Sequence, residues 1–166
     1  MTAIFPGTVP DTTSRTRRPA TSGSVAAEVL ADHLRRSDVL AGVDLAVTER
    51  TWVRLAAGAD AELWLITWPA GTSTGWHDHG SASGAFTVLR GSLTEHTWTG
   101  VATARTLEPG SLRTFDASHV HDVVNRGGET AVSLHAYAPS LAAMTRYELR
   151  RGRLSPVGVE QRGELW

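Results

Sequence analysis

The chain has 166 residues, a length that suits one domain with a substantial core. Its 16 basic and 17 acidic residues leave a net charge of −1, which gives no electrostatic reason to expect nucleic acid or an anionic membrane as a partner. No apolar run approaches the ~18 residues that span a bilayer. Because the chain has no cysteine, disulfides and thiolate ligands are excluded, and any metal must be bound through nitrogen and oxygen.

The N-terminal part divides into two segments. Residues 1–23 are rich in Thr, Ser, Pro and Arg and have no continuous apolar stretch, which predicts a flexible leader rather than a secretory signal. In Ser24–Arg36, the apolar residues Val25, Val29, Leu30 and Leu34 recur at helical spacing. We therefore predict one amphipathic helix, packed on the outside of the fold. Without a signal or cysteines, we expect a cytoplasmic protein.

From Trp52 onward the pattern changes to short strand-like runs separated by turn signals such as Pro109-Gly110. The runs are Trp52–Ala56, Leu63–Trp68, Phe86–Arg90, Ser92–Trp98, Val101–Leu107, Ser111–Phe115, Val120–Val124 and Ala131–Ala138, and Met144–Leu149 is a candidate for one more. This spacing is typical of an all-β barrel or jelly roll. We assign residues 24–154 to this domain and residues 155–166 to a C-terminal tail.

Three histidines form a candidate metal site. His77 and His79 are one residue apart in an extended segment, so their side chains point the same way. His121 returns later in the chain and completes a set of three imidazoles, which suit first-row metals and leave coordination positions open. His119 shares a face with His121 and is the alternative third ligand. The spacing from His121 to Asn125 favours His121.

A polar pattern marks the last predicted barrel strand. Ser133, His135 and Tyr137 alternate along it and therefore share one face, which we expect to face the barrel interior. A serine can bond a histidine, which in turn can bond a tyrosine phenol, so the three residues predict a relay that positions the phenol. The alternative is a polar inner face whose groups bond buried water.

The spacing from Gly71 through His77 and His79 to Gly91 matches the first motif of the cupin superfamily, and His121 with Asn125 resembles part of the second. With the Ser-Leu-His-Ala-Tyr sequence of residues 133–137, the chain resembles the cysteine dioxygenase family over roughly residues 50–150. The resemblance implies a cupin-type jelly-roll barrel with the metal inside its mouth. Ordinary cupins place a glutamate ligand where this chain has Gly84, so the implied ligands are three neutral histidines.

The same resemblance implies an activity in cysteine metabolism: Fe(II)- and O₂-dependent oxidation of the L-cysteine thiol to cysteine sulfinic acid. Tyr137 would lie beside the substrate. Arg54, in the arrangement Trp52-Val-Arg54, would bind the substrate carboxylate, with Arg50 as a near alternative. The cysteine–tyrosine crosslink of mammalian members is excluded by Gly84. Family members are often monomers, and we expect a monomer here.

Two other functions remain open at this point. One is a dioxygenase for a different small thiol, such as 3-mercaptopropionate, which gains support if Arg54 does not reach the metal pocket. The other is a cupin that binds a metal or ligand without catalysis, for which no thiol-dependent oxygen uptake is expected.

Overall fold

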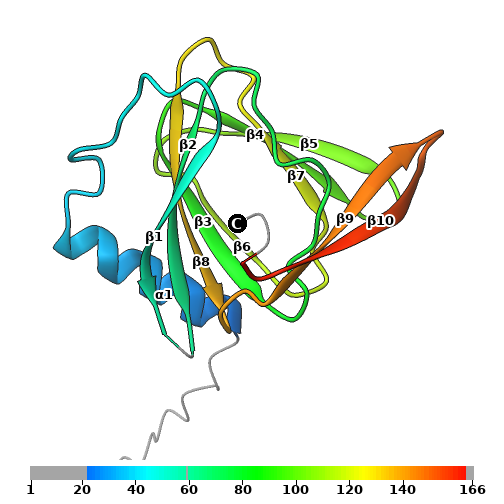
Figure 1. Ribbon diagram of the computed structural model, residues 1–166, viewed down its shortest axis with the longest axis horizontal. Helices are drawn as coiled ribbons and strands as arrows, with labels where there is room; N and C mark the ends of the chain where they lie inside the picture. The colour runs from blue at the N-terminus through cyan, green and yellow to red at the C-terminus, as the bar shows by residue number, and fades with distance from the viewer. Residues whose placement is uncertain (1–21, 59, 164–166) are drawn as a thin grey trace, which may run out of the picture.

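A computed structural model describes residues 22–58 and 60–163, which form one helix and ten strands (Figure 1). Most of the predicted leader, and residues 164–166 of the predicted tail, lie outside the described residues. In the described part of the chain, no helix is long and apolar enough to cross a membrane. The strands form the walls of a barrel, and the helix lies outside it (Figure 1).

All strand pairs are antiparallel. The largest sheet has five strands, in the order β1 (Thr51–Ala57), β2 (Glu62–Trp68), β8 (Ala131–Ala138), β3 (Ser83–Arg90) and β6 (Leu112–Phe115). A three-stranded sheet faces it, in the order β5 (Ala102–Leu107), β4 (Leu93–Trp98) and β7 (His121–Val124). The two remaining strands, β9 (Ala143–Arg150) and β10 (Arg153–Gln161), form a ribbon that projects from the barrel (Figure 1). The predicted all-β cupin-type barrel is confirmed.

Helix α1 (Ser22–Arg36) packs against the outer face of the five-stranded sheet, as predicted. Ala26 and Leu30, one helical turn apart, are buried in one apolar cluster with Ala85 of β3 and with Leu134 and Ala136 of β8. Each large aliphatic side chain buried in this way stabilises the fold by about 1.5–3 kcal/mol. The helix therefore covers one apolar face of the sheet and leaves the other face free for the barrel interior.

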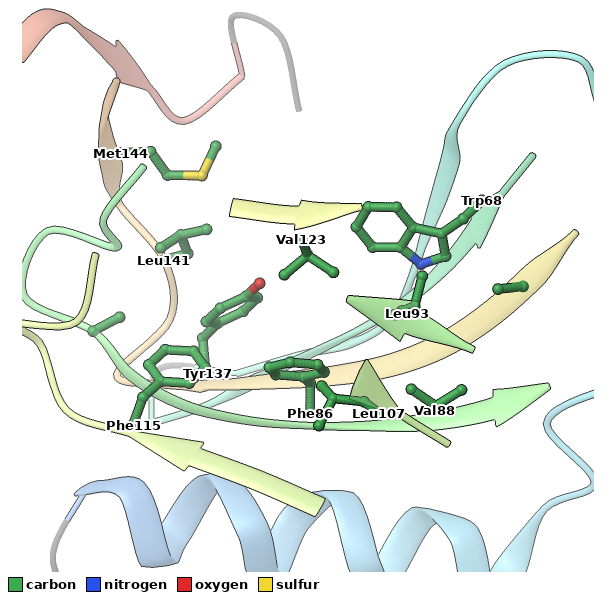
Figure 2. Close-up of a cluster of buried hydrophobic side chains, with 12 residues drawn as sticks. Trp68, Phe86, Val88, Leu93, Leu107, Phe115, Val123, Tyr137, Leu141 and Met144 are labelled. Carbon is green, nitrogen blue, oxygen red and sulfur yellow. The ribbon is translucent and has the colours of Figure 1, made fainter. Parts of the chain in front are cut away.

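The interior face of the same sheet carries a second apolar cluster (Figure 2). Trp68 alternates with the helix-facing residues of β2, and Phe86 and Tyr137 come from β3 and β8. Figure 2 shows Phe115 and Tyr137 side by side at one end of this cluster, with Trp68 at the other end and α1 beyond the sheet. Polar residues of the candidate site thus project into an interior that is otherwise apolar.

The eight predicted barrel strands match observed strands within three residues at each end, and Met144–Leu149 lies within β9. The difference is at the C-terminus, where residues assigned to a tail belong to β10 and pair with β9 along its whole length. Most of β10 is exposed, and its register shifts between Pro156 and Gly158. Because the strand buries no continuous face and contains a proline, it carries no alternating apolar signal.

Candidate metal centre

The loop that carries His77 and His79 is held against β7 by its backbone. The N–H of His77 donates to the carbonyl of His121 over 2.9 Å, and the N–H of His121 donates back over 3.0 Å. Between the two loop histidines, the Asp78 carboxylate points elsewhere and accepts bonds from the Thr145 N–H (3.0 Å) and the Tyr147 hydroxyl (2.8 Å). Asp78 therefore anchors the loop to β9, while the histidines on either side share the opposite face.

The structure brings His77, His79 and His121 together. Their ring nitrogens include one ligand atom each, and these atoms all lie within 4.8 Å of one another. The three side chains are buried, with exposed fractions of 5%, 1% and 2%. Burial is the largest cause that lowers the pKa of each imidazole, so all three are neutral near pH 7. Each ring therefore keeps a lone pair that can bind a metal ion.

These residues fit a metal ion by a further observation. Among the described residues, neither ring nitrogen of His79 has a hydrogen-bond partner, although both are buried. A buried polar atom without a partner is costly, and an ion bound to the three imidazoles would satisfy one of these nitrogens. The donor set, three neutral nitrogens with no sulfur, suits divalent iron, zinc, copper or nickel.

A buried carboxylate lies behind the site. Glu95, on β4, has no exposed surface and accepts hydrogen bonds from His121 Nδ1 (3.0 Å), His119 Nε2 (3.0 Å) and Arg113 Nε (2.6 Å). Burial alone would raise the pKa of Glu95, but the bonds from these three groups lower it well below its usual range. Because Nδ1 of His121 donates to Glu95, its Nε2 is the nitrogen left for a metal.

His119 is the partner of Glu95 and does not join His77 and His79. Glu95, His119 and His121 also lie close enough together to hold an ion. The carboxylate is already engaged by both imidazoles and by the Arg113 guanidinium, which opposes a second cation there. His121, and not His119, is therefore the histidine that the structure brings beside His77 and His79.

The polar residues of β8 form the predicted relay. Trp68 Nε1, which can only donate, donates a hydrogen bond to Ser133 Oγ over 2.8 Å. The Ser133 hydroxyl then donates to His135 Nε2 over 2.8 Å, so Nδ1 carries the proton of the neutral ring and faces the Tyr137 oxygen over 3.5 Å. Burial lowers the pKa of His135 to about 3 and is the main cause that raises the pKa of Tyr137. The phenol therefore keeps its proton and does not donate it to His135.

His77 and Tyr137 line the same cavity, which has a volume of about 550 Å³ including its open mouth. Its walls are aromatic and aliphatic, and its charged groups are the guanidinium groups of two arginines. The other lining residues are Arg50, Trp52, Trp64, Ile66, Thr74, Leu141, Met144 and Arg146. Such a cavity accepts a small molecule that carries an anionic group toward the arginines and a donor atom toward the histidines.

The sequence matches the family described as cysteine dioxygenase type I over residues 36–150, more than half of the chain. The chain belongs to the cysteine dioxygenase type I family. No curated protein matches it. The family supports a metal-dependent thiol dioxygenase as the general class of this protein.

Solved structures show the same fold at low identity. A conserved Klebsiella pneumoniae protein with a double-stranded β-helix domain is 18% identical, with a TM-score of 0.51 over 70% of this chain and 90% of the other. The Thermus thermophilus protein TT1209 is 17% identical, with a TM-score of 0.53 over 59% of this chain and 90% of the other. The cupin domain of Schizosaccharomyces pombe Cnp3 is 15% identical, with a TM-score of 0.52 over 59% of this chain and 69% of the other.

In this cysteine dioxygenase family member, the arginine expected at the cavity is not the one that the structure places there. Arg54 lies on the exposed strand β1, with its guanidinium 5.6 Å from the ring of Trp64, and does not line the cavity. Arg50 does line it. The β1–β2 register explains the difference, because it pairs Arg54 with Trp64 and Trp52 with Ile66, so Arg50 continues toward Trp68.

Arg50 has the properties of an anion-binding residue. Its guanidinium carbon lies 5.3 Å from the centroid of Trp52 and 5.4 Å from that of Trp68, which holds it by cation–π contacts. Within the described part of the chain, no carboxylate forms a salt bridge with it. Burial, followed by the nearby Arg146, lowers the pKa of Arg50, which nevertheless stays charged.

Three residues of this site were not predicted from the sequence. Glu95 is an acid on the inward face of β4, two residues after buried Leu93, and an acid at an apolar position was the available signal. Trp68 and Arg146 carry no such signal. Trp68 belongs to an ordinary apolar strand, and Arg146 reaches the cavity only because β9 crosses the barrel near the histidine loop.

Proposed function

We propose that this protein is a thiol dioxygenase that converts L-cysteine to cysteine sulfinic acid, with Fe(II) as its metal and O₂ as co-substrate. The observation that carries the proposal is one cavity that His77, the relay-bound Tyr137 and Arg50 all line. The other two neutral histidines, His79 and His121, are buried directly beside His77. Family membership supports the reaction class. An Fe(II) ion held by His77, His79 and His121 would supply thiolate binding and oxygen activation, chemistry that side chains lack.

The chain itself binds and orients the substrate. Arg50 offers two parallel N–H donors to a carboxylate, and its location in a partly desolvated aromatic setting strengthens that contact. Tyr137 donates its phenol proton into the cavity because its oxygen already faces a donor, His135 Nδ1. The apolar walls formed by residues such as Leu141 and Met144 limit the entry of water.

A second candidate substrate is 3-mercaptopropionate, which lacks the amino group of cysteine. No aspartate or glutamate is among the described residues that line the cavity, so no carboxylate side chain of the chain recognises an ammonium there. Recognition by the protein therefore rests on the thiol and the carboxylate, which the two compounds share. Cysteine remains the first candidate because of the family to which the chain belongs.

The test is oxygen consumption by Fe(II)-loaded protein with L-cysteine, 3-mercaptopropionate and cysteamine at equal concentrations, with product identified by mass spectrometry. Cysteamine is the matched control because it has the thiol and amine of cysteine but no carboxylate. Sulfinic acid formed fastest from cysteine supports the proposal, whereas preference for 3-mercaptopropionate transfers it to the second substrate. No uptake with any thiol refutes it and favours a cupin that binds a metal without catalysis.

A further inference from the structure

The three ligand histidines are held in different ways. His77 Nδ1 donates to the carbonyl of Gly75 over 2.9 Å, and His121 Nδ1 donates to Glu95 over 3.0 Å. Each bond fixes the tautomer and the ring orientation, so that Nε2 faces the centre. His79 is the exception, because neither of its nitrogens has a partner among the described residues.

What contacts His79 instead are aromatic rings: Tyr137, tilted at a centroid distance of 5.2 Å, and Phe115, which is closer and stacked. The Phe115 ring stacks on His79 with a centroid distance of 4.6 Å and an interplanar angle of 28°. Phe115 also stacks on His119, at 5.1 Å and 20°, and His119 is itself held by Glu95. Phe115 thus stacks on both a ligand histidine without hydrogen bonds and a histidine that a buried carboxylate fixes.

The space for this ring depends on Gly84. In the five-stranded sheet, Gly84 pairs with Phe115 on one side and with Tyr137 on the other. A Cβ on Gly84 would lie 2.3 Å from Cζ and 2.7 Å from Cε2 of Phe115, and 3.0 Å from the carbonyl oxygen of Ala136. Because the carbonyl belongs to the sheet backbone, any side chain at residue 84 must displace the phenylalanine ring.

We infer that Phe115 is the positioning residue for His79, and that Gly84 lacks a side chain in order to admit it. Stacking does for His79 what hydrogen bonds do for His77 and His121: it restricts the rotation of the imidazole and keeps one nitrogen aimed at the metal. The position where other cupins have a protein ligand is therefore taken by an aromatic support. This inference rests on the proposed metal site but not on thiol oxidation.

The experiment measures Co(II) affinity and the Co(II) absorption spectrum for wild type and for Phe115→Leu, Gly84→Ala and the double variant. Leucine is apolar but has no ring, so it removes the stack together with the atoms that conflict with a residue-84 Cβ. Each single change is expected to lower Co(II) affinity by about 10-fold or more, the range seen when the support of a metal ligand is removed. The Phe115→Leu spectrum should approach that of His79→Ala.

The double variant separates positioning from general packing. In the Phe115→Leu protein, Gly84→Ala meets no ring, so its additional effect on affinity should be less than about threefold, a clear departure from additivity. Phe86→Leu is the matched control, since Phe86 stacks on His135, a histidine outside the ligand set, at 4.8 Å and 6°, and meets the ligand His121 only edge-on, at 6.2 Å and 66°. Its Co(II) affinity should stay within about threefold of wild type.

Several outcomes overturn the inference: wild-type affinity in Phe115→Leu, effects that multiply in the double variant, or an equal loss in Phe86→Leu. Circular dichroism checks that each variant is folded, and if Phe115→Leu is not, Gly84→Ala alone must show the loss of affinity and the altered spectrum. A wild-type protein that does not bind Co(II) also overturns it. Tight, Phe115-dependent Co(II) binding without oxidation of any thiol refutes the dioxygenase proposal and leaves this inference standing.

Discussion

Replacing Arg50 by alanine tests how the substrate carboxylate is bound. The guanidinium lies between two tryptophan rings at 5.3 and 5.4 Å and has no salt bridge to a carboxylate in the described part of the chain, so its charge is available to a ligand. A hydrogen bond to a charged group is worth about 1.5–3 kcal/mol, and a bidentate contact contains two. Allowing for the water that replaces the side chain, we expect a loss of about 3 kcal/mol, or about 150-fold in kcat/KM.

The assay is the initial rate of oxygen uptake with L-cysteine over a range of concentrations. Arg50→Lys retains the charge without the bidentate geometry and should lose about 10-fold. Arg54→Ala is the matched control: it removes an arginine of β1 that does not line the cavity, and kcat/KM should stay within about twofold of wild type. Turnover of cysteamine, which has no carboxylate, should be insensitive to Arg50→Ala.

The reasoning is refuted if Arg50→Ala keeps wild-type kcat/KM for cysteine. A loss confined to Arg54→Ala would restore the expectation drawn from the Trp52-Val-Arg54 pattern. In that case, the side chain at the cavity in solution would differ from the one that the structure places there.

Three further changes have expected outcomes. Glu95→Gln leaves the Arg113 guanidinium without its buried counter-charge and weakens the acceptor that holds His121, so we expect a loss of about 3 kcal/mol in the free energy of unfolding and at least a 10-fold weaker Co(II) affinity. Urea denaturation and Co(II) titration measure the two effects, and an unchanged affinity would contradict the role assigned to this carboxylate. The pKa of His135 is about 3 in the folded protein and about 6.5 when unfolded, so its stabilising contribution is complete above pH 6.5 and is lost as the pH falls toward 3. His135→Gln should therefore show a shallower decline in unfolding free energy between pH 7 and pH 5, and identical slopes would argue against a neutral buried imidazole. Arg162→Ala removes the cation 3.2 Å from the fully buried Glu62 and should lower the free energy of unfolding by about 2–3 kcal/mol. Arg150→Ala, in an exposed ion pair, should lower it by less than about 1 kcal/mol. Equal losses in thermal or urea unfolding would count against the Glu62 contact.

Local signals were sufficient wherever the residues concerned are close in sequence. The barrel strands were predictable because burial on one or both faces imposes an apolar pattern, and β2 is buried along nearly its whole length. The alternation of Ser133, His135 and Tyr137 placed all three on one face for the same reason. Strand β10 escaped prediction because it buries almost nothing and contains Pro156.

The sequence by itself determined the barrel, the outer helix, the candidate ligands His77, His79 and His121, and the polar relay of β8. Periodicity, turn chemistry and a family motif act over a few residues, so they can be recognised in the sequence alone. Only the tertiary structure decided that Arg50 rather than Arg54 meets the cavity, and that Phe115 occupies the space beside Gly84. Both depend on which strands become neighbours and in what register, and one-dimensional patterns do not contain that information.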